Sequence, residues 1–359
     1  MTLLLMIALV LGLADGAFAQ APLTQWYRSE TNPVVQQVTF TGRFQHDFLV
    51  LDADQGDLNE SNVRRLRLGP RVTLFRTLTL HTEVELNPQE RDPLYVRLTD
   101  AYLQWTANRR FVLTVGKQGA PFTLDGATSS KELLTIDRSN LANNFWFPQE
   151  YLPGLSVSGR ASRWTYRAGV YSAGAMNREF GEFNGSYATL GSVGYDFAER
   201  FGTKEALLSA NYVHQPSDAD NTFTRPLEHI VSVNLKLESG RWGVRTDVAA
   251  AAGAPGQPAM QAVTLMPFLN LTARVQPVAR YTYIRADGPN GIRLATYESR
   301  VASGRGDRYD ELYVGANYYV SGHRLKVQSG LQWASLTNGP SDDEVYRGLS
   351  WTTGIRVGW

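Results

Sequence analysis

Cysteine is absent from the 359-residue chain, which excludes disulfide frameworks and cysteine-ligated metal sites and suits an oxidising compartment. Histidine is scarce, and no two of the five histidines stand at the spacing of metal ligands. The formal net charge is only +1, so the overall balance indicates neither nucleic acid nor an acidic partner. We therefore expect no cofactor, no metal and no nucleic-acid partner.

Long apolar runs are also missing. After residue 20 no apolar stretch approaches 18 residues, which excludes helical membrane spans. Before it, an apolar run from Leu3 to Leu13 is followed by Ala17-Phe18-Ala19, a small-x-small pattern typical of signal peptidase sites. The sequence predicts a signal peptide over residues 1–19, cleaved after Ala19, and one mature domain over residues 20–359. A buried N-terminal helix is the alternative.

Catalytic motifs are lacking as well. The chain has no G-x-S-x-G elbow, no phosphate-binding glycine loop followed by Lys-Ser/Thr, and no H-E-x-x-H. We therefore expect a protein that is not an enzyme. A hydrolase whose nucleophile and base meet only in the folded chain remains the alternative.

Period-two alternation of apolar and polar residues is abundant. In a strand such residues point to opposite faces, so each alternating segment predicts a strand with one apolar face. The last residues, GLSWTTGIRVGW, follow the same pattern and end on Trp359. A second example places Val231, Val233, Leu235 and Leu237 on one face, with Ser232, Asn234, Lys236 and Glu238 on the other.

About sixteen such segments follow one another, and their connections alternate between short and long. The segments lie near 34–48, 62–75, 77–87, 95–107, 110–118, 154–161, 164–174, 186–197, 204–214, 228–238, 241–252, 260–271, 273–286, 309–320, 323–335 and 349–359. The long connections are Leu49–Ser61, Gln118–Pro153, Gly174–Gly185, Gln215–Leu227, Ala286–Arg308 and Leu336–Gly348. An even strand number with tight turns at one end and long loops at the other is typical of a transmembrane β-barrel.

A soluble β-sandwich is the competing all-β fold. Charged residues on the inner face argue against it, because a sandwich core requires apolar packing there. Aromatic residues gather near segment ends, as at Trp164 and Tyr166, which suits membrane-interface girdles. The predicted fold is therefore an all-β, transmembrane antiparallel barrel of about 16 strands.

The predicted inner face is basic. Its acids are Glu83, Glu85, Asp100, Asp196, Glu238 and Asp247. Its cations are Arg65, Arg67, Arg71, Arg160, Arg167, Lys236, Arg245, Arg274, Arg280, Arg324, Lys326 and Arg356. Cations that line a channel favour anions, so about twelve cations against six acids predict an anion-preferring pore.

Cross-strand pairing offers a structural interpretation of the same arginines. A hairpin that turns near Arg76 places Arg67 opposite Glu85 and Arg71 opposite His81. The arginine row would then be partly neutralised and would hold the barrel wall. For Arg67 the two interpretations are equally supported.

The longest connection, Gln118–Pro153, carries a further signal. Ser129 and Glu132 have capping-box spacing and apolar residues follow, which predicts a short helix near 130–141. As the third long loop of the barrel, this apolar segment is expected to fold inward and narrow the pore.

Two stretches resemble the phosphate-selective porin O and P family: DAYLQW with TVGKQGAPFTLDGATSSKELLTIDRS at Asp100–Ser139, and ELYVGANYYVSGHRLKVQ at Glu311–Gln328. The resemblance implies a sixteen-stranded porin of the Gram-negative outer membrane, in contact with its lipid, trimeric, with a constricting third loop. It implies passive conduction, with phosphate or polyphosphate preferred through lumen arginines and lysines. It also implies that the barrel assembly machinery reads the closing aromatic, Trp359.

One feature departs from the family. The third loop carries two basic residues, Lys131 and Arg138, against Asp125, Glu132, Asp137 and Glu150, which argues against assuming phosphate selectivity. We therefore expect a diffusion channel for small hydrophilic solutes, with anions favoured. A structural or adhesin-like barrel is the alternative. The candidate pore-lining residues are Arg65, Arg67, Arg71, Lys117, Lys131, Arg138, Arg160, Arg167, Arg280 and Lys326.

Overall fold

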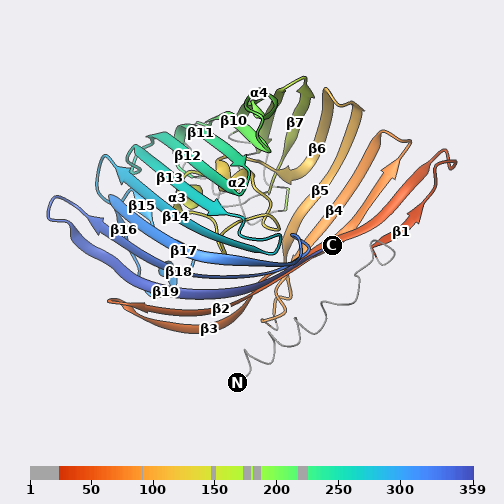
Figure 1. The fold of residues 1–359 in the computed structure, drawn as a ribbon. Coiled ribbons are helices and arrows are strands. Elements are labelled where there is room, and N and C mark those ends of the chain that lie inside the picture. The colour runs from red at the N-terminus through yellow and green to blue at the C-terminus, as the bar shows by residue number, and fades with distance from the viewer. Residues whose placement is uncertain (1–23, 91, 147–150, 173–178, 181–186, 217–224) are drawn as a thin grey trace.

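The computed structural model describes residues 24–90, 92–146, 151–172, 179–180, 187–216 and 225–359 (Figure 1). The predicted signal peptide lies outside these residues. Sixteen antiparallel strands form a closed barrel, which confirms the predicted fold class and strand number. No helix in the described part of the chain is long and apolar enough to cross a membrane.

The barrel strands follow the chain order around the wall. They are β2 (Val35–Ala53), β3 (Gly56–Leu74), β4 (Leu78–Leu86), β5 (Tyr95–Asn108), β6 (Phe111–Gly119), β7 (Tyr151–Ala161), β8 (Trp164–Ser172), β9 (Tyr187–Asp196), β10 (Glu205–His214), β11 (Leu227–Ser239), β12 (Trp242–Gly253), β13 (Met260–Leu269), β14 (Val275–Ala286), β17 (Arg308–Ser321), β18 (Leu325–Asn338) and β19 (Asp343–Gly358).

The barrel closes where β19 pairs with β2. The register runs from Gly358 opposite Arg43 to Gly348 opposite Ala53. The short strand β1 (Gln25–Arg28) pairs with residues 37–39 of β2, the part of that strand with which β19 does not pair. The seam is therefore shared by both ends of the described chain.

Alternation within the strands separates two faces, as predicted. In β11 the side chains of Val231 and Val233 are 43% and 41% exposed, whereas Ser232 and Asn234 between and beside them are buried. Because successive side chains of a strand point to opposite faces, the exposed apolar residues form the outer surface and the polar ones face the lumen. This is the arrangement that a lipid environment requires.

Two connections predicted as long are short. β2 and β3 continue past the predicted loop to a turn at residues 54–55, and Leu51 pairs with Leu58 there. β18 and β19 likewise continue to a turn at residues 339–342. The prediction failed because Leu49 and Leu51 are buried on the inner face, so the pattern of one apolar outer face breaks down at this end of the barrel.

The third connection at this end of the barrel, here called L3 and described over residues 120–146, enters the barrel. Its helices α2 (Leu124–Ala127) and α3 (Asn140–Phe145) lie inside the ring of strands in Figure 1. The predicted helix near 130–141 is wrong, because residues 130–138 form turns and bends and α3 begins only at Asn140. Ser129 starts a backbone turn to Glu132 rather than a helix.

A second connection, residues 287–307, here called L7, also contributes to the lumen. It contains the short strands β15 (Ile292–Arg293) and β16 (Arg305–Gly306) and the 3-10 turn η1 (Glu298–Arg300). Ile292 and Leu294 of L7 belong to one buried apolar cluster with Leu141 and Phe145 of α3. L3 and L7 therefore pack together inside the barrel.

Candidate pore constriction

Wall side chains hold the middle of L3 by its backbone carbonyls. Lys326 Nζ donates to Leu133 O at 2.6 Å, and Asn317 Nδ2 donates to Leu134 O at 2.9 Å. Arg280 Nη1 donates to Asp137 O at 2.7 Å. These three donors hold residues 133–137 against the wall in a non-helical conformation, so the capping-box signal in this segment is not followed by a helix.

The most deeply buried arginines of the wall are paired with acids. Arg280 Nε lies 2.6 Å from Glu311 Oε1, and both side chains are 1% exposed. Arg67 is buried and lies 3.1 Å from Glu85. The predicted hairpin register is confirmed, with Arg67 opposite Glu85 and Arg71 opposite His81. Cross-strand pairing therefore neutralises part of the arginine row.

The predicted charge inventory needs correction. It omitted inward acids that pair with its cations: Asp47 with Arg356 and Glu205 with Arg245, besides Glu311. Two of its cations, Arg274 and Arg324, are exposed outside the strands, before β14 and before β18. The net charge of the lumen is therefore much closer to zero than the alternation of residues along the strands indicated. The electrostatic field in the pore depends on which cations face open space.

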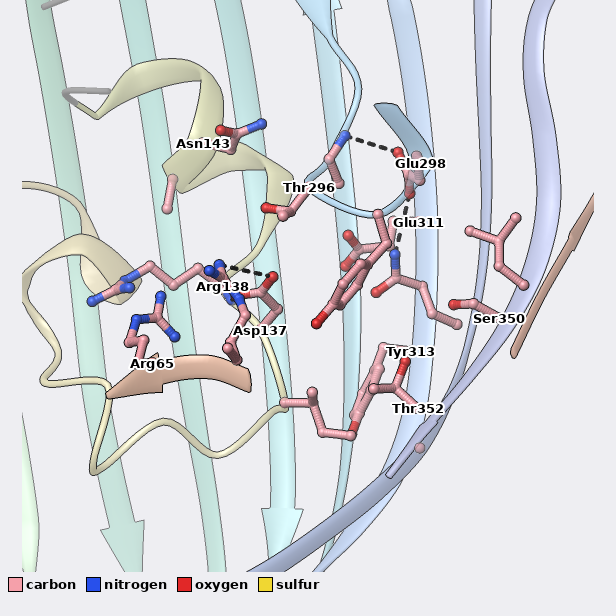
Figure 2. Close-up of a pocket in the computed structure, with 18 of the residues that line it drawn as sticks. Arg65, Asp137, Arg138, Asn143, Thr296, Glu298, Glu311, Tyr313, Ser350 and Thr352 are labelled. Carbon is pink, nitrogen blue, oxygen red and sulfur yellow. Dashed lines mark hydrogen bonds and ion pairs between the residues drawn. The ribbon is translucent and has the colours of Figure 1, made fainter. Parts of the chain in front are cut away.

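An open space, here called the constriction cavity, lies between L3, L7 and the wall (Figure 2). Its volume is about 310 Å³. Figure 2 shows Arg65 and Arg138 on one side and Glu298 and Glu311 on the other. Two of the predicted site residues, Arg65 and Arg138, line this cavity. The cavity's remaining charged lining residues are Arg64, Arg97, Arg225, Glu85 and Asp137.

A β-bulge brings Arg64 to this cavity, a residue that sequence reasoning missed. Gln45 pairs with Arg65 but His46 pairs with Val63, so the register shifts by one residue at Arg64. The extra residue lets both adjacent arginines point inward. Arg64 Nη2 lies 3.3 Å from Asp137 Oδ1. Two adjacent arginines interrupting an alternating strand were the available signal.

Two acids of the cavity lie in different electrostatic environments. Burial opposes ionisation of Asp137, but Arg64, Arg65 and Arg138 outweigh it and hold the pKa of this carboxyl below its ordinary value. Burial raises the pKa of Glu298 to about 7. The Glu298 carboxyl accepts hydrogen bonds from Tyr309 Oη at 2.8 Å, Gln332 Nε2 at 3.2 Å and Ala295 N at 3.0 Å, all neutral donors.

Arg138 is the residue of L3 that lies where this loop narrows the lumen. Its Nε donates to Asp125 O at 2.8 Å, and its guanidinium lies 5.0 Å from the centre of the Trp146 ring. These backbone and ring contacts fix the position of the cation. Arg138 and Trp146 also line a second space, here called the turn-side cavity, of about 300 Å³, together with Arg43 and Arg167. Arg138 thus stands between the two cavities.

The other predicted residues lie elsewhere. Lys117 Nζ is paired with Glu179 at 2.6 Å, and Lys131 Nζ donates to Trp359 O at 2.9 Å. Arg160 is paired with Asp196 at 3.0 Å on an exposed part of the wall, and Arg71 is exposed. Among the described residues there is no group of three potential metal ligands.

Comparison with known proteins shows which structures and which family this barrel resembles. No curated protein matches the sequence significantly. Among solved structures, an anion-selective porin from Comamonas acidovorans is 12% identical, over 90% of this chain and 99% of that one, with a TM-score of 0.63. The outer membrane channel DcaP of Acinetobacter baumannii is also 12% identical, over 93% and 99%, with a TM-score of 0.61.

A third similar structure is the trimer form of OmpT, an outer membrane protein of Vibrio cholerae, which is 14% identical over 90% of this chain and 99% of that one, with a TM-score of 0.50. These similarities support the barrel fold. The family model of the phosphate-selective porin O and P matches residues 38–253, more than half of the chain. The chain belongs to the phosphate-selective porin O and P family, and is an outer-membrane porin.

Proposed function

We propose that this porin is a passive channel for small hydrophilic solutes with a modest preference for small anions. The observation that carries the proposal is the position of Arg138. It lies on both the constriction cavity and the turn-side cavity, with Arg64 and Arg65 on the first and Arg43 and Arg167 on the second. A solute passing L3 would meet a guanidinium at each step, and cations lining a pore favour anions.

The acids of L3 do not cancel this preference. Asp137 is paired with Arg64, and Asp125 Oδ2 accepts a hydrogen bond from Ser139 N at 2.8 Å at the start of α3. Glu132 is exposed, and Glu150 lies outside the described residues. Glu298, which accepts hydrogen bonds from the neutral donors Tyr309, Gln332 and Ala295 N, remains opposite the arginines across the constriction cavity, which is why we propose a modest preference rather than a strict one.

We assign two roles to the residues singled out in the sequence. Arg65, Arg138 and Arg167 line the cavities and would contact solutes. Arg67, Arg280 and Lys326 are buried and hold the wall or L3, so they would act on selectivity only through position. Lys117, Lys131, Arg71 and Arg160 line neither cavity.

Three finer points belong to the same proposal. The family name suggests phosphate or polyphosphate as a solute. The trimer form of the similar Vibrio cholerae protein supports a homotrimer here. We further propose that Trp359 is read by the barrel assembly machinery during insertion. A chain with no enzymatic activity is the corresponding expectation for a family of channels.

Planar-bilayer recording of the purified protein tests the proposal. We expect stepwise conductance, a reversal potential in a KCl gradient that indicates chloride preference, and a partial block of the chloride current by added phosphate. Absence of steps would remove the channel function and favour a structural or adhesin-like barrel. A cation-selective current would show that acids such as Glu298 dominate the constriction instead.

A further inference from the structure

The ribbon inside L7 places two arginines directly opposite each other. β15 pairs with β16 in antiparallel register, and Arg293 is the cross-strand partner of Arg305. Directly opposed like charges destabilise a pair of strands. A two-stranded ribbon has little else to offset that cost. The pairing is therefore a feature that needs a physical reason.

A third arginine faces the same space from another connection. Arg225, between β10 and β11, lines a cavity of about 360 Å³ together with Arg293 and Arg305, here called the ribbon cavity. Its Nε and Nη2 donate to Asn143 O of α3 at 3.0 Å and 2.6 Å. These bonds fix the guanidinium at the edge of the cavity and bring three positive charges from two connections to one site.

The ribbon cavity differs from the constriction cavity in its lack of acids. None of the described residues that line it is a carboxylate. Its other polar lining side chains are the amide of Asn143 and the hydroxyls of Thr296, Ser299 and Ser303. Amides and hydroxyls can complement an oxyanion, but they do not neutralise an arginine.

Local contacts confirm that the three charges are not compensated by acids of the described chain. Arg305 Nη1 donates to Gln257 Oε1 at 3.2 Å and to Asn290 O at 3.5 Å, which are neutral acceptors. Burial, together with Arg293 and Arg305, lowers the pKa of Arg225 to about 9. Burial and Arg305 lower the pKa of Arg293 to about 10.

The arginine side chains are not what holds the ribbon in place. Asn144 Oδ1 accepts from Arg293 N at 2.9 Å, and Asn140 Nδ2 donates to Arg293 O at 2.9 Å. Asn143 Nδ2 donates to Leu294 O at 3.0 Å. Three asparagines of α3 therefore seat the ribbon by its backbone, and this function would survive if the ribbon carried neutral side chains.

We propose that Arg225, Arg293 and Arg305 form a binding site for a small multivalent oxyanion, of which inorganic phosphate is the simplest, at the long-loop end of the barrel. Guanidinium groups form paired, charge-assisted hydrogen bonds with such anions. The bound anion would cancel the repulsion between Arg293 and Arg305 and would link L7 to the connection that carries Arg225. The site shares no cation except Arg225 with the constriction cavity, and it does not depend on ion selectivity there.

Calorimetric titration of the detergent-solubilised protein with inorganic phosphate, at constant ionic strength in chloride, tests this site. We expect binding to the unsubstituted protein and at least about tenfold weaker binding after Arg293→Gln, with a larger loss after Arg293→Gln and Arg305→Gln together. Arg300→Gln is the matched control, because Arg300 lies on the same connection but is paired with Glu60 at 2.5 Å.

Thermal unfolding provides a second readout, because the direction of the change in Tm depends on whether phosphate is present. Without phosphate, Arg293→Gln should leave Tm unchanged or raise it, since one of two opposed charges is removed; with phosphate, only the unsubstituted protein and Arg300→Gln should gain Tm. Equal phosphate binding by the double variant, or none by the unsubstituted protein, would overturn the proposal. Loss of phosphate binding in Arg65→Gln with Arg138→Gln, but not in the double variant, would place the anion in the constriction and leave the proposed channel function intact.

Discussion

The wall around L3 and the ribbon of L7 use arginine in opposite ways. In the wall, Arg280 is buried against Glu311 and donates to L3, so its charge is neutralised within the protein. In the ribbon, Arg293 stands opposite Arg305 and no described carboxylate lines their cavity. Pairing, rather than the number of lumen cations, therefore decides where this barrel can attract an anion.

Breaking a paired arginine should have the largest effect. Arg280→Met leaves Glu311 buried without its cation and removes the donor to Thr135 and Asp137 of L3. Loss of one partner of a buried pair costs about 3–5 kcal/mol, so we expect a lower unfolding free energy in urea and faster proteolysis of L3.

The matched control is the combined change Arg280→Met with Glu311→Leu, which removes both charges. Replacing both members of a buried pair by apolar residues is often close to neutral, so most of the lost stability should return. If the double variant were as unstable as Arg280→Met alone, packing against L3 rather than the stranded carboxylate would be the cause.

The buried acid of L7 gives a smaller effect that depends on pH. The pKa of Glu298 is about 7 in the folded protein and its ordinary value is 4.5. Its stabilising contribution is therefore complete below pH 4.5 and is lost as pH rises through about 7, by at most about 1.4 kcal/mol per pH unit. Hydrogen exchange of L7 amides, corrected for intrinsic rates, should show more frequent opening at pH 8 than at pH 5.

Glu298→Gln should abolish that difference, because the amide cannot ionise. Glu344→Gln, which changes an exposed acid at the same end of the barrel, should preserve it. Opening of L7 that is independent of pH in the unsubstituted protein would mean that Glu298 is not the titrating group.

The seam allows assembly to be separated from selectivity. Gly42 and Trp359 exchange backbone hydrogen bonds of 3.2 Å, and a Cβ on Gly42 would lie 2.4 Å from the Trp359 ring. We expect Gly42→Ala and deletion of Trp359 to reduce the amount of folded protein in the outer membrane, while pores that do form keep the same reversal potential. Gly191→Ala, where a Cβ meets nothing within 4 Å, should insert normally.

Much of the fold could be predicted from the sequence because the outer face of each strand repeats a simple pattern. Val231 and Val233 alternate with Ser232 and Asn234, and this period fixes both strand and orientation. The inward hairpin pair of Arg67 with Glu85 followed from the same counting. The ends of β2 and β3 were missed because Leu49 and Leu51 face inward there.

The site was less predictable because it depends on contacts between distant segments. Arg64 reaches the constriction cavity only through a bulge, and Arg225 only because α3 binds its guanidinium. The capping-box signal at Ser129 was genuine local information, but wall donors such as Lys326 hold the residues that follow it against the wall in a non-helical conformation. The contacts of Arg225 with α3 and of Lys326 with L3 are not visible in the spacing of residues along one strand.

Cations that line the two cavities, rather than the buried arginine–acid pairs of the wall, should set the ion preference of the pore. The most direct test compares reversal potentials in a KCl gradient for Arg138→Gln, which changes the cation shared by both cavities, and for the combined change Arg67→Gln with Glu85→Gln, which removes a buried pair. We expect Arg138→Gln to shift the reversal potential toward that of a non-selective pore and the combined change to leave it near the unsubstituted value. A larger shift for the combined change than for Arg138→Gln would mean that the buried pairs set the ion preference.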